Sequence, residues 1–191
     1  MPAKPGERKL QILQVLAQML ENPRGERVTT AALAAKLEVS EAALYRHFAS
    51  KAQMFEGLIE FIEQTLFGLI NKINAEEPDG LKQLETMLAL LLGFAKKNPG
   101  MSRVLIGDAL VNEDGRLQTR INQLHDRLEA TVKQALRIAV TQNGTGSEVV
   151  DVAAQANALM SFVTGRWHQF AKSGFKRDPM EFWQAQRHRL F

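Results

Sequence analysis

Apolar residues recur at intervals of three and four along almost the entire chain, whereas runs in which β-branched or apolar residues alternate with polar ones are nearly absent. The first spacing is that of one face of an α-helix, and the second is that of a half-buried strand. The chain is therefore predicted to be all-α. Its 191 residues, 45% of them hydrophobic, are enough to bury a core, and without cysteine no disulfide can support the fold.

Prolines, glycines and asparagines divide this periodic pattern into separate helices. Breaks fall at residues 76–79, 98–100 and 143–146. The predicted helices cover residues 7–21, a short segment capped by Thr29, and residues 41–48, 51–75, 80–97, 102–110, 115–141 and 149–172, with a last helix opened by Asp178 and Pro179.

Three helix caps fall within about twenty residues near the start of the chain. Thr29 and Ser40 can each cap a short helix. Ser50 begins a long helix, and Gln53 three residues later completes a Ser-x-x-Gln capping box. Two short helices followed by a long one are typical of a helix-turn-helix.

The second of these short helices has the layout of a recognition helix. Leu44 and Phe48 lie one turn apart and define its buried side, with Ala42, Ala43 and Arg46 opposite them. Small residues allow a helix to enter the major groove, and a guanidinium can reach guanine O6 and N7. Arg46 is therefore the predicted base-edge contact.

Other residues nearby are suited to phosphate contacts, which position a protein on DNA without reading its sequence. Threonines at a helix N-terminus and a lysine in the first turn of the long helix are typical of such contacts. Lys4, Arg8 and Lys9 form a weaker candidate arm. The residues predicted to contact DNA are Thr29, Thr30, Ser40, Ala42, Ala43, Tyr45, Arg46, His47 and Lys51.

Charge is distributed unevenly although the net charge is only +3. Residues 1–51 carry eight Lys and Arg against five Asp and Glu, residues 52–165 carry ten against fourteen, and residues 166–191 carry six against two. A basic front end on an acidic middle fits a DNA-reading head joined to a body with another role.

The segment with this layout reads TTAALAAKLEVSEAALYRHFASK, and it resembles the N-terminal signature of the TetR family. The resemblance implies a TetR-like fold, with an N-terminal arm and helix-turn-helix domain in residues 1–50 (the motif itself at about 29–48). A helical dimerisation and partner-binding domain in residues 51–191 would follow. A dimer with two heads would read a pseudo-palindromic site on double-stranded DNA.

Two apolar stripes in the body are suited to helix pairing. The first runs from Leu117 to Ile138 at three- and four-residue steps. The second is flanked by small residues, Ala153, Ser161 and Gly165, that allow helix axes to approach closely. We expect the homodimer interface mainly on this second stripe, which comprises Val152, Ala156, Leu159, Val163, Trp167 and Phe170.

Phe61 lies about 110° from the centre of the apolar stripe of its helix, close to Thr65 and Gly68 on the wheel. This position fits either a shallow groove for a peptide or an aromatic residue that another helix covers.

A second set of segments, LIEFIE, LLLGF followed by KNPG, and GRLQTRINQL, is similar to the nucleoid occlusion factors within the TetR family. That resemblance implies a DNA-bound protein that engages the C-terminal tail of the division GTPase FtsZ, so that no septum forms over the chromosome. Leu69 stands where relatives can carry a basic residue, and Lys97 replaces an arginine. The implied tail-binding residues are Phe61, Leu69, Leu90, Gly93, Lys97 and Asn98.

A ligand-responsive transcriptional repressor remains the alternative, because the apolar segment from Met87 to Phe94 could line an inducer pocket or form plain core. We expect core, and hence no small-molecule ligand. The four histidines lack metal-ligand spacing, and no Walker loop, GxSxG turn or zincin helix occurs. The chain is thus predicted to be no enzyme, to use no cofactor or metal, and to be cytoplasmic and nucleoid-associated.

Overall fold

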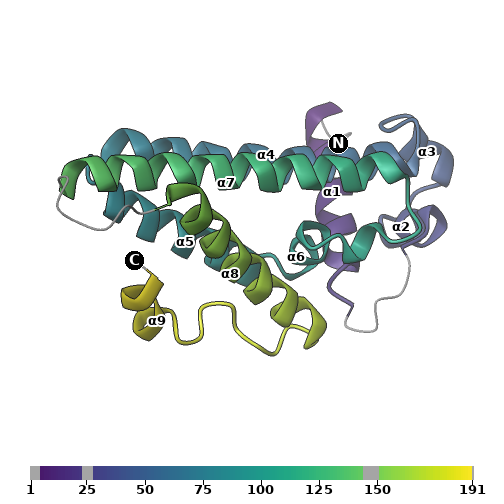
Figure 1. Ribbon diagram of the computed structural model, residues 1–191. Coiled ribbons are helices and arrows are strands. Elements are labelled where there is room, and N and C mark those ends of the chain that lie inside the picture. Colours follow the sequence, from purple (N-terminus) through teal and green to yellow (C-terminus); the bar gives the residue numbers. More distant parts are fainter. Residues whose placement is uncertain (1–4, 23–27, 144–150, 191) are drawn as a thin grey trace.

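The computed structural model describes residues 5–22, 28–143 and 151–190, and within these ranges every regular element is helical (Figure 1). This confirms the predicted all-α, TetR-like fold. No helix in the described ranges has both the length and the apolar character that a membrane span needs. The elements are α1 (Pro5–Met19), α2 (Thr30–Lys36), α3 (Glu41–Tyr45), α4 (Lys51–Glu76), α5 (Gly80–Lys97), α6 (Pro99–Leu105), the 3-10 helix η1 (Asp108–Leu110), α7 (Gly115–Asn143), α8 (Val152–Lys172) and α9 (Trp183–Leu190).

The first three helices gather at one end of the molecule and form the head, while α4 and α7 run side by side along the body (Figure 1). In the body, α5 packs against α4, α7 and α8. The short helix α6 lies between the two parts and packs against both α1 and α8. The chain therefore passes from the head into the body through α4, and α6 adds a second connection because it packs against helices of both parts.

The predicted caps are present in the structure. The side-chain oxygens of Thr29, Ser40 and Ser50 accept hydrogen bonds from the backbone N–H groups of Ala32, Ala43 and Gln53 at 3.1, 3.3 and 3.1 Å. The Gln53 side chain returns to the backbone N–H of Ala49 at 2.8 Å rather than to that of Ser50. Each cap satisfies a helix N–H that has no partner within its own helix.

Several helix boundaries differ from the prediction, and two of the differences in the body have a clear backbone cause. The helix expected over residues 102–110 begins at Pro99, whose fixed φ suits the first helical position, and is interrupted by Gly107 with φ 76° before η1. The last helix begins only at Trp183, after Phe182 adopts φ 66°. A left-handed residue cannot continue a right-handed helix, so the preceding segment from Asp178 forms turns.

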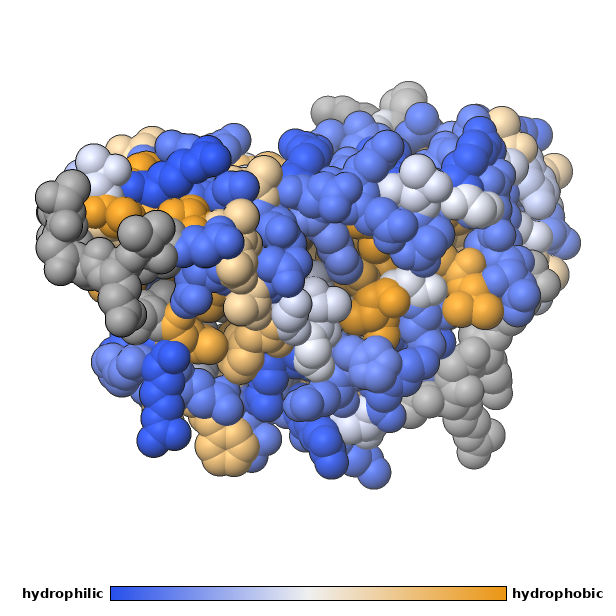
Figure 2. Space-filling view, viewed as in Figure 1, coloured by the Kyte–Doolittle hydropathy of each residue, from blue (hydrophilic) through white to orange (hydrophobic). Residues whose placement is uncertain are grey.

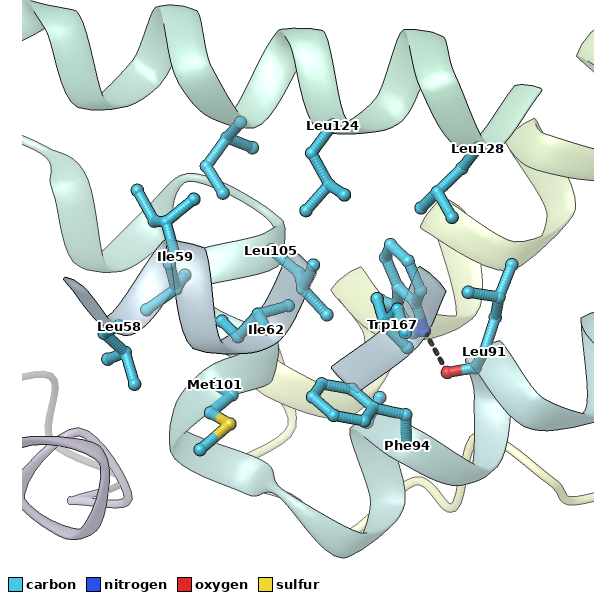
Figure 3. Close-up of a cluster of buried hydrophobic side chains, with 14 of the residues drawn as sticks. Leu58, Ile59, Ile62, Leu91, Phe94, Met101, Leu105, Leu124, Leu128 and Trp167 are labelled. Carbon is cyan, nitrogen blue, oxygen red and sulfur yellow. Dashed lines mark hydrogen bonds between the residues drawn. The ribbon is translucent and has the colours of Figure 1, made fainter. Parts of the chain in front are cut away.

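Trp167 lies at the centre of the body, where α4, α5, α7 and α8 meet (Figure 3). Its indole is 0% exposed, and its Nε1–H donates to the backbone oxygen of Leu91 in α5 at 2.9 Å. The indole ring also lies 5.9 Å from the imidazole of His125, centroid to centroid. The surrounding labelled side chains include Ile62, Phe94, Leu124 and Leu128.

The stripe predicted to form the dimer interface belongs instead to this core, so the assignment was wrong. Its members on α8 are covered by helices of the same protomer, with Ala156, Leu159, Val163, Trp167 and Phe170 between 0% and 4% exposed and Val152 half-buried. Most of the stripe on α7 is buried in the same way. The small residues that flank the stripe, Ala153, Ser161 and Gly165, are exposed. A pairing surface on α8 would therefore lie on the side of the helix opposite the buried stripe.

Candidate nucleic-acid interface

The turn between α2 and α3 is a Schellman motif centred on Glu38. This residue has φ 55°, its N–H donates to the oxygen of Ala35 at 3.1 Å, and the N–H of Val39 donates to the oxygen of Ala34 at 3.0 Å. A left-handed conformation costs a residue with a Cβ about 1–2 kcal/mol. Two backbone hydrogen bonds and the packing of α2 on α3 offset this cost, and the turn fixes how the two helices cross.

The recognition segment presents the faces that the wheel predicts. Regular α-helix ends at Tyr45, earlier than expected. The N–H groups of His47 and Phe48 both donate to the oxygen of Leu44, at 2.9 and 3.1 Å, so a further turn extends to Phe48. Leu44 and Phe48 are 1% and 8% exposed. Ala42, Tyr45 and Arg46 are exposed, whereas Ala43 and His47 are half-buried.

Arg46 is free to reach a ligand. Its side chain is exposed, and among the described residues none forms a hydrogen bond or ion pair with it. A guanidinium carries five N–H donors in a planar fork, so leaving it without a protein partner next to small residues keeps those donors available.

The two threonines at the start of α2 are engaged within the head. Thr29 caps the helix, and the Thr30 hydroxyl donates to Glu41 Oε2 at 2.6 Å. Glu41 is an acidic neighbour that the sequence interpretation did not include, and no local pattern signals a bond across eleven residues. The backbone N–H groups at the start of α2 stay the predicted phosphate contact of this segment.

Lys51 points toward the body. Its Nζ lies 2.5 Å from Glu113 Oε1, in the segment before α7, and 5.6 Å from the centroid of the Phe55 ring. The phosphate contact predicted for Lys51 would require this pair to break. Of the proposed arm, Lys4 lies outside the described residues, while the Lys9 amine sits 5.5 Å above the Phe48 ring, beside the recognition segment.

The residues implied in tail binding lie on two consecutive helices that pack together, α4 and α5. Phe61, Leu90 and Gly93 are half-buried, and Phe61 and Leu90 pack against the core; Leu69 is 43% exposed. A Cβ added at Gly93 would meet no atom within 4 Å, so this part of α5 faces open space. At the end of α5, Lys97 is exposed and the Asn98 amide donates to the oxygen of Phe94 at 2.8 Å.

Comparison with known proteins assigns the family. Residues 25–58 match the family model described as bacterial regulatory proteins, tetR family, and residues 78–191 match the SlmA-like model, described as tetracyclin repressor-like, C-terminal domain. The nucleoid occlusion factor SlmA of Alteromonas mediterranea is 54% identical over 187 residues, covering 97% of this chain and 95% of that protein. The SlmA of Marinomonas sp. (strain MWYL1) is 50% identical over 186 residues, covering 97% and 94%. The chain belongs to the SlmA family.

Solved structures show the same fold at low identity. The TetR family transcriptional regulator PfmR from Thermus thermophilus has a TM-score of 0.74 at 23% identity, covering 94% of this chain and 96% of that one. FadR from Bacillus subtilis, solved in complex with stearoyl-CoA, has a TM-score of 0.75 at 12% identity, covering 95% and 96%. Members of the SlmA and TetR families are DNA-binding regulators and not enzymes, which agrees with the prediction for this chain.

A groove of about 570 Å³ lies between α7 and α8 on the side of α8 away from the core. Figure 2 shows this face, with patches of apolar and intermediate hydropathy over α8 between hydrophilic surfaces. The residues that line the groove include His125, Asp126, Glu129, Gly165 and His168. Among the described residues, no group forms a hydrogen bond with the buried Nε2 of His125.

Acidification is expected to destabilise the protein through His125. Burial lowers the pKa of His125 below 6.5, although a hydrogen bond with the Leu105 backbone and the charge of Asp126 partly oppose this shift. The unfolded chain therefore binds the proton more readily than the folded one, so the contribution is complete above pH 6.5 and is lost as the pH falls below it. Chemical denaturation measures the free energy of unfolding at about pH 7.5 and at about pH 5.5. The decrease between the two pH values should be smaller for His125→Gln than for the wild type. Equal losses in the two proteins would contradict the assignment.

Proposed function

We propose that this protein is a sequence-specific nucleoid occlusion factor that binds DNA as a homodimer. When bound to DNA, it engages the C-terminal tail of FtsZ and thereby blocks assembly of the Z-ring and septum over the chromosome. The observation that carries the proposal is a capped helix-turn-helix with a free, exposed Arg46 in a chain 50–54% identical to relatives named nucleoid occlusion factor SlmA.

The reading role of the head is supported by the division of labour in the recognition segment. Leu44 and Phe48 anchor the segment in the head, and the small side chain of Ala42 lets its exposed face enter the major groove. Arg46 supplies the N–H donors that reach guanine there. Tyr45 and His47 flank this reading face and contact the phosphate backbone on either side of the groove.

The dimer is supported by the outer side of α8. Small exposed residues recur there at four- and three-residue steps, and they line up on one face: Ala154, Ala158, Ser161 and Gly165. Small side chains let two helices approach closely, and the groove between α7 and α8 offers a place for side chains of a second copy. This face replaces the buried stripe as the proposed two-fold interface.

The partner role is supported by the shape and charge of the α4–α5 surface. Half-buried Phe61 and Leu90 and exposed Leu69 offer apolar contacts beside the open space at Gly93, and Lys97 adds a positive charge. An amphipathic segment of FtsZ can place apolar side chains against such a surface and an acidic group near the lysine.

A two-step binding experiment tests the proposed function. Selection from a random DNA library identifies the preferred duplex, and an electrophoretic shift with that duplex is repeated in the presence of an FtsZ C-terminal tail peptide. We expect a ternary complex of slower mobility, and weaker capture of the peptide by the protein without DNA. DNA binding that is indifferent to the peptide at saturating concentration would instead indicate a transcriptional repressor.

Substituting Arg46 by alanine is expected to weaken binding to the selected duplex by about 1–3 kcal/mol, because a base-edge contact is lost. Affinity for a random duplex should change much less. Fluorescence anisotropy with both duplexes measures the two losses, and Arg137→Ala, at an exposed position toward the end of α7 that lies away from the head (Figure 1), serves as the control. Equal losses on the two duplexes would assign Arg46 to the phosphate backbone.

A further inference from the structure

Arg103, on α6, is a charged residue inside the protein, with 8% of its surface exposed. Its guanidinium forms hydrogen bonds with Asp108, Leu20 and Asn22, and none of these is a predicted DNA-binding or tail-binding residue. A charge in such a position is stable only if its hydrogen bonds and its countercharge are supplied by the protein. The partners of Arg103 come from both the head and the body.

On the head side, Arg103 binds the end of α1. Its Nη1 donates to the backbone oxygens of Leu20 and Asn22 at 3.3 and 3.5 Å, just beyond the last residue of the helix. Carbonyls at a helix C-terminus lack partners in their own helix and favour a positive charge. One turn earlier, α6 touches α1 so closely that a Cβ at Gly100 would overlap the backbone oxygen of Ala17.

On the body side, Arg103 belongs to a row of three alternating charges, Arg103, Asp108 and Lys172. Its Nε donates to Asp108 Oδ2 at 2.8 Å, and the other oxygen of Asp108 accepts a hydrogen bond from Lys172 in the last turn of α8. Burial would raise the pKa of Asp108, but the hydrogen bonds from Lys172 and Arg103 outweigh it and hold the pKa below its usual value. The carboxylate is therefore ionised and bridges the two cations at neutral pH.

We infer that Arg103 is a positioning residue for DNA recognition, which fixes the angle of the head by linking the end of α1 to the end of α8 through Asp108 and Lys172. The inference rests on the proposed dimer. If two copies pair along α8, the angle between each head and its own α8 sets the distance and rotation between the two recognition segments. That angle in turn sets the half-site spacing that both heads can read at once.

Half-site spacing is the property that separates positioning from plain stabilisation. One base pair more or less shifts the second half-site by about 3.4 Å and turns it around the DNA axis. A rigid pair of heads tolerates this shift poorly, whereas heads that pivot more freely tolerate it better. A residue that only stabilises the fold would lower affinity for all spacings alike.

The test uses the full-length protein and the duplex selected as described above, together with versions whose central spacer is one base pair shorter or longer and a random duplex. Arg103→Met keeps an apolar stem of similar length and removes the guanidinium. We expect affinity for the selected duplex to fall about tenfold, the preference over altered spacers to fall to within about threefold, and binding to the random duplex to change less than about twofold. Lys72→Met, which removes an exposed pair with Glu76 at 3.8 Å near the end of α4 that lies away from the head (Figure 1), should behave like the wild type.

Lys172→Met provides a second variant, because Lys172 is half exposed and its loss does not leave Arg103 without a countercharge. The same change in spacing preference, smaller in size, is expected in a protein whose circular dichroism and melting temperature match the wild type. If Arg103→Met does not fold, Lys172→Met decides the inference. An unchanged spacing preference in the folded variants overturns the inference alone, whereas a wild type without any spacing preference overturns the proposed dimeric function and the inference with it.

Discussion

Replacing Trp167 by alanine is expected to lower the free energy of unfolding by about 3–5 kcal/mol. The indole is fully buried where four helices meet, so its removal leaves a cavity that rigid helix backbones cannot close. It also removes the N–H that donates to the oxygen of Leu91, a contact that ties α8 to α5. Urea denaturation at one fixed protein concentration measures the loss, because dimerisation makes stability depend on concentration.

Two matched variants separate the contributions of Trp167. Trp167→Phe keeps most of the aromatic volume but loses the hydrogen bond, and should cost about 1–2 kcal/mol. Thr86→Ala, at an exposed position on α5 outside the groove between α7 and α8, should change stability by no more than about 0.5 kcal/mol. A loss below about 1 kcal/mol for Trp167→Ala would show that the core relaxes around the missing ring.

Glutamate at position 61 is expected to abolish binding of the FtsZ tail peptide while leaving DNA affinity within about twofold of the wild type. Phe61 is half-buried at the α4–α5 surface, and a central aromatic anchor of this kind can carry more than 2 kcal/mol of binding energy. The substitution also places a negative charge where apolar atoms of the peptide would be desolvated. We therefore expect at least a hundredfold loss by fluorescence anisotropy with labelled peptide and saturating DNA.

Phe67→Glu is the control for the Phe61 variant, because it introduces the same change on the same helix but on another face. Phe67 lies under the guanidinium of Arg127, 4.1 Å from the ring centroid, and so faces α7 rather than α5. This variant should retain tail binding even if it loses some stability. Loss of both DNA binding and tail binding in Phe61→Glu would assign Phe61 to the core.

The helix caps of the head and the buried and exposed faces of the recognition segment could be predicted from the sequence, because these features are local. Thr29, Ser40 and Ser50 cap the helices they were expected to cap, and each bond spans three residues. The inward orientation of Leu44 and Phe48, and the free Arg46 opposite, follow from a rotation of about 100° per residue over two turns.

The body shows what the sequence could not determine. A helical wheel gives the angles between side chains of one helix, but it does not say which neighbouring helix covers which face. The apolar stripe of α8 was predicted to be a pairing surface and is part of the protomer core.

The same reason explains the charged contacts that the sequence did not reveal. Lys51 pairs with Glu113 across 62 residues, and Arg103 reaches α1 across 83 and 81 residues. The sequence by itself determined the helices, their caps and the reading face, because these depend on neighbours within about four residues of one another. Only the tertiary structure decided which faces stay exposed and which charges meet, because burial and ion pairing depend on how distant helices pack.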